Sequence, residues 1–286
     1  MRELSNDLSS LALNTGTLGH NLDGHGAGWS PERVIDACAA RDLGGIVWWR
    51  RELGERARDI GERVRAAGLE VVGLCRSPFL VGPLAPPTRT AVLDDFEGSI
   101  ETAATLGAAT LTIVVGGVES GTRGLDESLR RVADVLAEVA PRAADAGVTL
   151  ALEPLHPVYA GDRSCLVTVR DALALCDAVD HPALAVAVDV YHVWWDRTLG
   201  ETLAGAGAGR IAGLHLCDWL AETRDVLLDR GMMGDGVADI RGIRRMVEEA
   251  GYRGPCEVEI FSARDWWTRE PDEVLDRCVE RFRSVC

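Results

Sequence analysis

Four short apolar segments of the sequence lead into a residue that could bind a metal ion or carry a proton. Segments 148–152, 184–188 and 211–214 are each followed by such a residue, and segment 256–258 lies directly before another. An unpaired buried carboxylate costs several kcal/mol or changes its protonation state, so each of these charges needs a partner. The four residues therefore predict a shared metal site. They are Glu153, Asp189, His215 and Glu259.

The ligand types narrow the choice of metal. Three carboxylates and one imidazole suit one hard or borderline divalent ion, so we expect Mn²⁺, with Mg²⁺ or Co²⁺ as alternatives. The absence of thiolate ligands argues against a closed structural zinc site. Taken singly, each residue is better explained as a helix cap or a loop charge. Four of them at four successive strand ends favour the metal site.

Three of the four predicted ligands are each followed, three positions later in the sequence, by another polar residue. At that spacing each side chain would still reach the predicted metal site. These side chains could orient the ligands or contact the substrate directly. Ordinary polar loop residues are the alternative interpretation. The three residues are His156, His192 and Asp218.

All eight tryptophans lie at or just after predicted strand ends, on the side where the strands finish. Aromatic rings stack well on the apolar faces of sugars, so we expect Trp48 and Trp195 to bind substrate. Loop packing or an oligomer interface is the alternative, and the exposed rings suggest a homodimer or homotetramer. Arg163 lies on the same side, as do Arg50, Arg51 and Arg76, and could bind phosphate or hydroxyl groups.

Short apolar segments alternate with longer amphipathic stretches along the whole chain, which is typical of successive β-α units around a parallel sheet. Eight such units fit a single (β/α)8 TIM barrel spanning residues 1–286, with the site at the carboxyl ends of the strands. An open doubly wound sheet is the competitor, but no G-x-G-x-x-G follows the first strand. The predicted strands are 11–15, 45–49, 70–75, 110–115, 148–152, 184–189, 211–214 and 256–261.

Composition limits the function further. The net charge of −15 argues against nucleic acid and against an anionic membrane as partners. Because the sequence shows neither a signal peptide nor an apolar run long enough to span a membrane, we expect a cytoplasmic protein. All 30 basic residues are arginine, which excludes Schiff-base aldolases and P-loop nucleotide binders, since both need lysine.

Several motifs resemble the sugar phosphate isomerase/epimerase superfamily, the xylose-isomerase-like barrels. They are Leu152-Glu153-Pro154, Val188-Asp189-Val190-Tyr191-His192, Leu214-His215-Leu216-Cys217-Asp218, Gly234-Asp235-Gly236 and Glu257-Val258-Glu259-Ile260-Phe261. The resemblance implies that the four strand-end residues bind one divalent metal and that His192 contacts substrate. One departure is Ala221, six residues past the histidine ligand, where ketose epimerases usually carry arginine.

Three functions fit these observations. The leading hypothesis is a metal-dependent isomerase or epimerase of a sugar or keto-inositol, in which Glu153 and Glu259 transfer the proton through a metal-stabilised enediolate. The alternative is a lyase or dehydratase that forms the same enolate from a keto-inositol or 3-keto-glycoside and expels a leaving group, with His156 or His192 as general acid. The third is a non-catalytic sugar-binding barrel. In each case the partner is a small sugar or polyol.

Overall fold

Eight parallel strands close into a barrel in which each strand pairs with the next and the last pairs with the first. The computed structural model describes residues 7–207 and 209–286. The strands are β1 (Leu11–Asn14), β2 (Gly45–Trp49), β3 (Glu70–Cys75), β4 (Thr110–Ile113), β5 (Thr149–Leu152), β6 (Leu184–Asp189), β7 (Ile211–Leu216) and β8 (Cys256–Val258). The predicted (β/α)8 barrel is confirmed.

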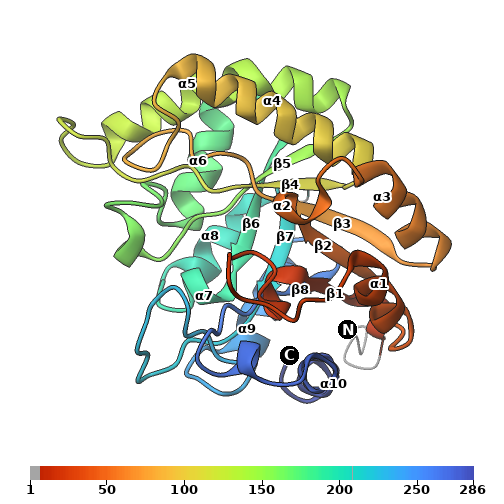
Figure 1. Ribbon diagram of the computed structural model, residues 1–286. Coiled ribbons are helices and arrows are strands. Elements are labelled where there is room, and N and C mark those ends of the chain that lie inside the picture. The colour runs from red at the N-terminus through yellow and green to blue at the C-terminus, as the bar shows by residue number, and fades with distance from the viewer. Residues whose placement is uncertain (1–6, 208) are drawn as a thin grey trace.

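Helices surround the strands, and successive helices pack against one another around the barrel (Figure 1). They are α1 (Pro31–Ala39), α2 (Arg50–Leu53), α3 (Ala57–Ala66), α4 (Arg89–Leu106), α5 (Asp126–Asp145), α6 (Val169–Val179), α7 (Val190–Val193), α8 (Leu199–Ala206), α9 (Ile240–Glu249) and α10 (Pro271–Val285). Within the described part of the chain, none of these helices is both long enough and apolar enough to cross a bilayer.

The helix starts follow local sequence signals. The side chain of Ser30 accepts a hydrogen bond from the Arg33 backbone N–H, and Pro31 takes the first position of α1. Thr88 caps α4 in the same way, and Gly107 ends that helix with a positive φ of 82°. These two caps fix where α1 and α4 begin.

Alternation along the strands separates an outer apolar core from the barrel interior. On β5 the side chains of Leu150 and Leu152 pack into the core that the strands share with the helices. Residues of the opposite parity face the interior, as the contact between Glu153 and His215 shows. Seven of the eight cysteines join the outer core, and all eight are free and buried, as expected for reduced thiols.

Four strand ends differ from the prediction, and the smallest difference is at β1, which ends at Asn14, one residue early. β4 ends at Ile113 and β8 at Val258, each earlier than predicted, whereas β7 continues to Leu216. The apolar residues after β4 and β8 are buried in loops, so burial continues where the ladder hydrogen bonds have stopped. A hydrophobic run alone cannot distinguish these two situations.

Candidate metal centre

The four predicted ligands meet inside the barrel at the carboxyl ends of strands β5 to β8. Glu153 directly follows β5, Asp189 ends β6, His215 lies near the end of β7, and Glu259 directly follows β8. All four side chains are buried, and one ligand atom from each lies within 4.8 Å of the others. Within this set, His215 Nδ1 and Glu153 Oε1 lie 2.7 Å apart.

This set fits a divalent ion. Ligand atoms that each lie about 2.1 Å from one ion are separated by no more than about 4.2 Å, so only a small inward movement is needed. Three carboxylates and one imidazole are hard and borderline donors, and three buried carboxylates at one point need a cation. The residues present could therefore hold one such ion.

A buried arginine that the sequence did not reveal lies beside the ligands. The Arg230 guanidinium is 3% exposed, and its Nη1 lies 3.2 Å from Asp189 Oδ2 and 3.1 Å from Glu259 Oε2. Its carbon centre lies 4.2 Å from the Phe261 ring centroid and 4.5 Å from that of Tyr191. Arg230 thus neutralises part of the acidic cluster and fixes one oxygen of each carboxylate.

A second acidic layer lies beneath the four ligands. Glu257 Oε2 lies 3.2 Å from His215 Nε2, on the far side of the ring from Glu153. Asn14 Nδ2 donates to Glu257 Oε1 at 2.5 Å and to Glu259 Oε1 at 2.9 Å. Since Cys75 Sγ also belongs to this group, the cluster could look like a second metal site.

The orientation of Asn14 argues against a second ion there. Its Oδ1 accepts hydrogen bonds from Trp49 Nε1 and from the Gly16 backbone N–H, both at 2.8 Å. These two donors fix the amide so that its NH₂ group points at Glu257, Glu259 and Cys75. The amide therefore already supplies the positive end of a dipole to this cluster.

Burial strongly affects the acidity of the carboxyl groups. It raises the pKa of Asp189 to about 6 and the pKa of Glu259 to about 8, and Arg230 opposes both shifts. Burial also raises the pKa of Glu257, while His215 opposes this shift. A cation at the centre would favour the ionised form of each group.

The pKa values of the two buried histidines, His192 and His215, are shifted in opposite directions. Burial acts to lower the pKa of His215, but the charge of Glu257 and the hydrogen bond with Glu153 outweigh it, so the pKa is raised well above its usual value. Burial and the charge of Arg230 lower the pKa of His192 well below its usual value. His192 is therefore a neutral imidazole.

His192 and His156 lie next to each other at the edge of the centre. His192 Nδ1 accepts a hydrogen bond from the His156 backbone N–H at 3.2 Å, and its Nε2 lies 3.4 Å from Arg230 Nη2 and 3.6 Å from Asp189 Oδ2. The His156 ring stacks on Trp219 at 4.6 Å and meets Trp195 edge-on at 5.8 Å. Trp195 therefore lies next to these two histidines, and its role in substrate binding stays a prediction.

Asp218 does not have the predicted role of substrate ligand. Each of its two carboxylate oxygens accepts two hydrogen bonds from backbone N–H groups, at 2.9 to 3.0 Å, and the side chain is 1% exposed. A carboxylate with four backbone donors has no lone pair left for a sugar. Asp218 instead holds the loop between β7 and α9. The four donors are Trp219, Gly234, Gly236 and Ala238.

Trp48 also differs from its prediction. It is 0% exposed and packs with Ile46 in the outer core, since both have the parity that faces the helices. Its neighbour Trp49 points inward, where Nε1 donates to Asn14 Oδ1. Of the two adjacent tryptophans, Trp49 is therefore the one at the candidate site.

A cavity of about 780 Å³ opens beside the centre, over the ends of β2 and β3. Trp49 and Cys75 belong to its lining and connect it to Asn14 and so to Glu259. The volume suits a sugar-sized ligand. Arg76 also lines this cavity, whereas Arg163, which was predicted to bind substrate, lies outside the lining and contacts Asp162 at 3.7 Å.

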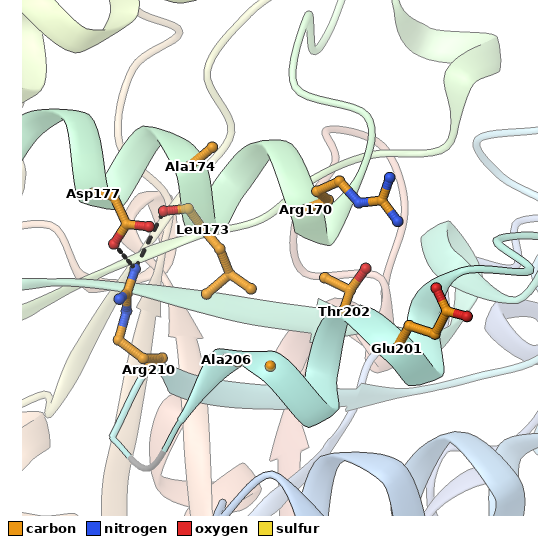
Figure 2. Close-up of a pocket in the computed structure, with 9 residues that line it drawn as sticks. Arg170, Leu173, Ala174, Asp177, Glu201, Thr202, Ala206 and Arg210 are labelled. Atoms are coloured by element: carbon orange, nitrogen blue, oxygen red, sulfur yellow. Dashed lines mark hydrogen bonds and ion pairs between the residues drawn. The ribbon is translucent and has the colours of Figure 1, made fainter.

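A second cavity of about 480 Å³ lies outside the barrel between α6 and α8 (Figure 2). Arg210 crosses one end of it, with Nη2 2.7 Å from Asp177 Oδ1 and 3.2 Å from the Leu173 carbonyl oxygen. None of the predicted site residues lines this groove, so we assign it no part in the chemistry.

The residues that sequence reasoning missed fall into two kinds. Asn14 and Glu257 carried a usable signal, because each has the inward parity of its strand, Glu257 two residues before Glu259. Arg230 carried none, because it lies in a long loop without periodicity.

Fold and site together define a (β/α)8 barrel with a candidate metal centre at the carboxyl ends of its second four strands. The family model of the xylose isomerase-like TIM barrel matches residues 35–284, so the chain belongs to that family. The family resemblance noted from the sequence motifs is confirmed.

Two named relatives are sugar epimerases. The L-ribulose-5-phosphate 3-epimerase UlaE of Salmonella typhi is 25% identical over 251 residues, which cover 82% of each chain. The ketose 3-epimerase of Arthrobacter globiformis is 25% identical over 256 residues, which cover 77% of this chain and 82% of the relative.

Solved structures share the fold. The protein SMc04130 from Sinorhizobium meliloti 1021 is 42% identical, with a TM-score of 0.88 over 98% of this chain and 99% of its own. The IolI protein, solved with a bound zinc atom, superposes with a TM-score of 0.82 at 20% identity, over 96% of this chain and 97% of its own. The second match shows likeness of fold alone.

Proposed function

We propose that this chain is a divalent-metal-dependent epimerase or isomerase of a sugar or keto-inositol. The observation that carries the proposal is the convergence of four buried ligand atoms within 4.8 Å, three of them from carboxylates at the ends of different strands. Glu153, Asp189, His215 and Glu259 would hold the ion, for which Mn²⁺ is our first choice on donor type. The named sugar epimerases among the relatives support the same reaction class.

A bound ion would supply the positive charge that polarises a substrate carbonyl and stabilises the negative charge developing beside it. Glu153 and Glu259 approach the centre from β5 and β8, with β6 and β7 between them. We assign to one of them removal of the proton next to the carbonyl, and to the other its return. Return to the opposite face inverts the carbon, whereas return to the next carbon isomerises the sugar.

Other residues of the centre would orient the substrate. The Nε2 of His192 lies beside Asp189 and Arg230, where it could exchange a hydrogen bond with a sugar hydroxyl. Trp49 and Trp195 offer aromatic edges and faces on two sides of the centre. Arg230 holds Asp189 and Glu259 in place, so each carboxylate keeps one oxygen fixed.

Two other functions, a non-catalytic sugar-binding barrel and a lyase, have less support from the site. Both Glu153 and Glu259 face the centre, which is what a catalytic barrel requires and a purely sugar-binding barrel does not. Elimination from a keto-inositol or 3-keto-glycoside stays open as the alternative, with His156 or His192 as its acid. Burial lowers the pKa of His156, and its Nδ1 already accepts a hydrogen bond from Val158 N–H, which gives elimination less support.

The test is hydrogen exchange in D₂O. Manganese-loaded protein is incubated with ketoses, keto-inositols and 3-keto-glycosides, and deuterium incorporation is followed by NMR and mass spectrometry. Incorporation with the carbon skeleton intact is the expected result, and loss of water or of the aglycone would instead identify a lyase. Absence of exchange with every substrate, despite bound metal, would contradict both.

Glu153→Gln sharpens this test. Losing a general base should lower the exchange rate by more than about 10²-fold. Glu138→Gln, on the exposed side of α5, makes the same chemical change away from the centre and should leave the rate unchanged. If Glu153→Gln keeps its metal and exchanges at the wild-type rate, Glu153 is not a base in this reaction.

A further inference from the structure

The cavity beside the centre is positively lined, although the chain as a whole carries a net charge of −15. Three arginines line it, with a single acidic residue, Asp95. An acidic protein has no general reason to collect cations at one cavity, and such a local field attracts an anionic ligand. The three arginines are Arg50, Arg51 and Arg76.

Two of the three arginines already have acidic partners. Arg50 Nη1 lies 2.5 Å from Asp95 Oδ1 and donates to Ser99 Oγ at 2.8 Å. The Arg51 guanidinium pairs with Asp23, whose side chain is largely exposed. Both charges are thus balanced within the protein, so neither makes the cavity a strong anion site.

Arg76 has no such partner. It directly follows β3, and among residues 7–207 and 209–286 no carboxylate lies within 4.0 Å of its guanidinium. The guanidinium carbon lies 3.9 Å from the Phe79 ring centroid, and Nη1 donates to the Ser77 carbonyl oxygen at 3.0 Å. The remaining N–H groups of the planar fork are free to bind two oxygens of one anion.

The electrostatic environment of Arg76 supports the same conclusion. Burial lowers the pKa of Arg76 to about 10, and the positive charge of Arg163 acts in the same direction. Two cations in one partly buried region raise the cost of leaving either unpaired. The charge of Glu153 acts on the pKa of Arg76 as well, so the guanidinium lies within electrostatic reach of the metal centre.

We infer that Arg76 binds an anionic group, a phosphate or a carboxylate, on the sugar substrate, and so selects sugar phosphates or sugar acids over neutral sugars. The inference rests on the proposed function, since it assumes a sugar whose reacting carbons lie between Glu153 and Glu259. The cavity that contains Arg76 also contains Cys75 and Trp49, which border the centre through Asn14. One sugar can therefore reach both places.

The experiment compares three probes on manganese-loaded protein by isothermal titration calorimetry. They are L-ribulose, L-ribulose 5-phosphate and the keto acid D-fructuronate. Two charge-assisted hydrogen bonds should make one anionic probe bind about 10- to 100-fold more tightly than L-ribulose. Preference for the phosphate or for the acid identifies the source of the anion, and inorganic phosphate should compete with the preferred probe.

Substitutions of Arg76 test whether this residue causes the preference for an anionic probe. Arg76→Met should remove the preference for the anionic probe while changing the affinity for L-ribulose less than about threefold, and Arg76→Lys should keep part of it. Arg170→Met removes one arginine from the outer groove between α6 and α8 and should behave as wild type (Figure 2). If Arg76→Met fails to fold, the wild-type probe comparison and phosphate competition still decide the question.

The same probes are then followed for deuterium exchange, which separates this inference from the proposed function. Anion-selective binding without exchange of any probe would support the anion site and contradict the isomerase. If L-ribulose exchanges as fast as both anionic probes and binds as tightly as they do, the result would support the isomerase and overturn the anion site. Equal binding of all three probes to wild-type protein overturns it as well.

Discussion

His215 is held by a carboxylate at each ring nitrogen. Glu153 Oε1 lies 2.7 Å from Nδ1, and Glu257 Oε2 lies 3.2 Å from Nε2. A histidine ligand needs its second nitrogen fixed, because that contact sets the tautomer and the ring orientation. Glu257 therefore acts as a positioning residue for His215, even though it would not touch the ion.

Glu257→Gln should weaken metal binding by about 10- to 100-fold. The glutamine oxygen can still accept from Asn14 Nδ2, but its NH₂ group would then face the protonated Nε2 of His215. Two donors repel, so the ring would turn or change its tautomer. The measurement is the manganese dissociation constant by competition with a chelator, which does not depend on any substrate.

Glu101→Gln on the exposed side of α4 is the matched control for that change. It should bind manganese as wild type does. If Glu257→Gln also binds manganese with unchanged affinity, the contact at Nε2 does not orient the ligand. His215 would then be oriented by packing alone.

Side-chain parity explains which residues of the site could be predicted. A charged residue at the end of an apolar strand has only the interior or solvent to face, so Glu153 and Asp189 were found from sequence. The sequence does not distinguish Trp48 from Trp49 as the substrate-binding ring, because the register of β2 decides which of the two points inward. Arg230 reaches the centre from a loop, where no period predicts direction.

At the scale of elements, the loop between β7 and α9 is held by two buried aspartates. Asp218 binds four backbone N–H groups, and Asp229 accepts from the backbone N–H, Nε and Nη2 of Arg224. Asp229 directly precedes Arg230, so the loop conformation decides whether Arg230 reaches the two ligands it contacts.

These hydrogen bonds predict that the loss of stability caused by Asp229→Asn depends on pH. The hydrogen bonds from Arg224 lower the pKa of Asp229, so its stabilising contribution is present above the unfolded pKa of about 4 and is lost as the pH falls toward the folded value. At pH 7 the variant should be about 1 to 3 kcal/mol less stable than wild type. This difference should shrink below about pH 4.

Urea denaturation at pH 7, 5 and 3.5 measures this difference. Asp177→Asn, which removes the exposed partner of Arg210, should cost less than about 1 kcal/mol at each pH. A constant difference for Asp229→Asn across the three pH values would show that the ionised form of Asp229 does not stabilise the loop.

The ranges of three strands, β2, β3 and β6, agree with the sequence prediction. The short helices α2 and α7 were not predicted, since four residues cannot display a helical period. Nothing in the sequence of the long loop between β7 and α9 indicated that it enters the site.

At the scale of the whole molecule, the barrel closes around buried negative charge. Asp189, Glu153, Glu257 and Glu259 lie together in the interior with Arg230 and His215 as the neighbouring cations. Without an ion at the proposed metal centre these charges repel one another, so a bound ion would stabilise the barrel.

Chelation should therefore lower the melting temperature. At a manganese concentration about 1,000-fold above the dissociation constant, the ion contributes about 4 kcal/mol to the free energy of unfolding. Differential scanning calorimetry with manganese and with EDTA measures the change. Asp189→Asn should show little difference between the two conditions, and an equal melting temperature for wild-type protein in both would contradict the metal site.

The two halves of the barrel hold different parts of the proposed site. The candidate ligands come from β5 to β8, whereas the lining of the positive cavity lies entirely within residues 21–95. Substitutions in the loops after β2 and β3 can therefore change which sugar is accepted while the ligand-bearing strands stay the same. In evolutionary terms, a duplicated gene could acquire a new substrate through its first half and inherit its chemistry through the second.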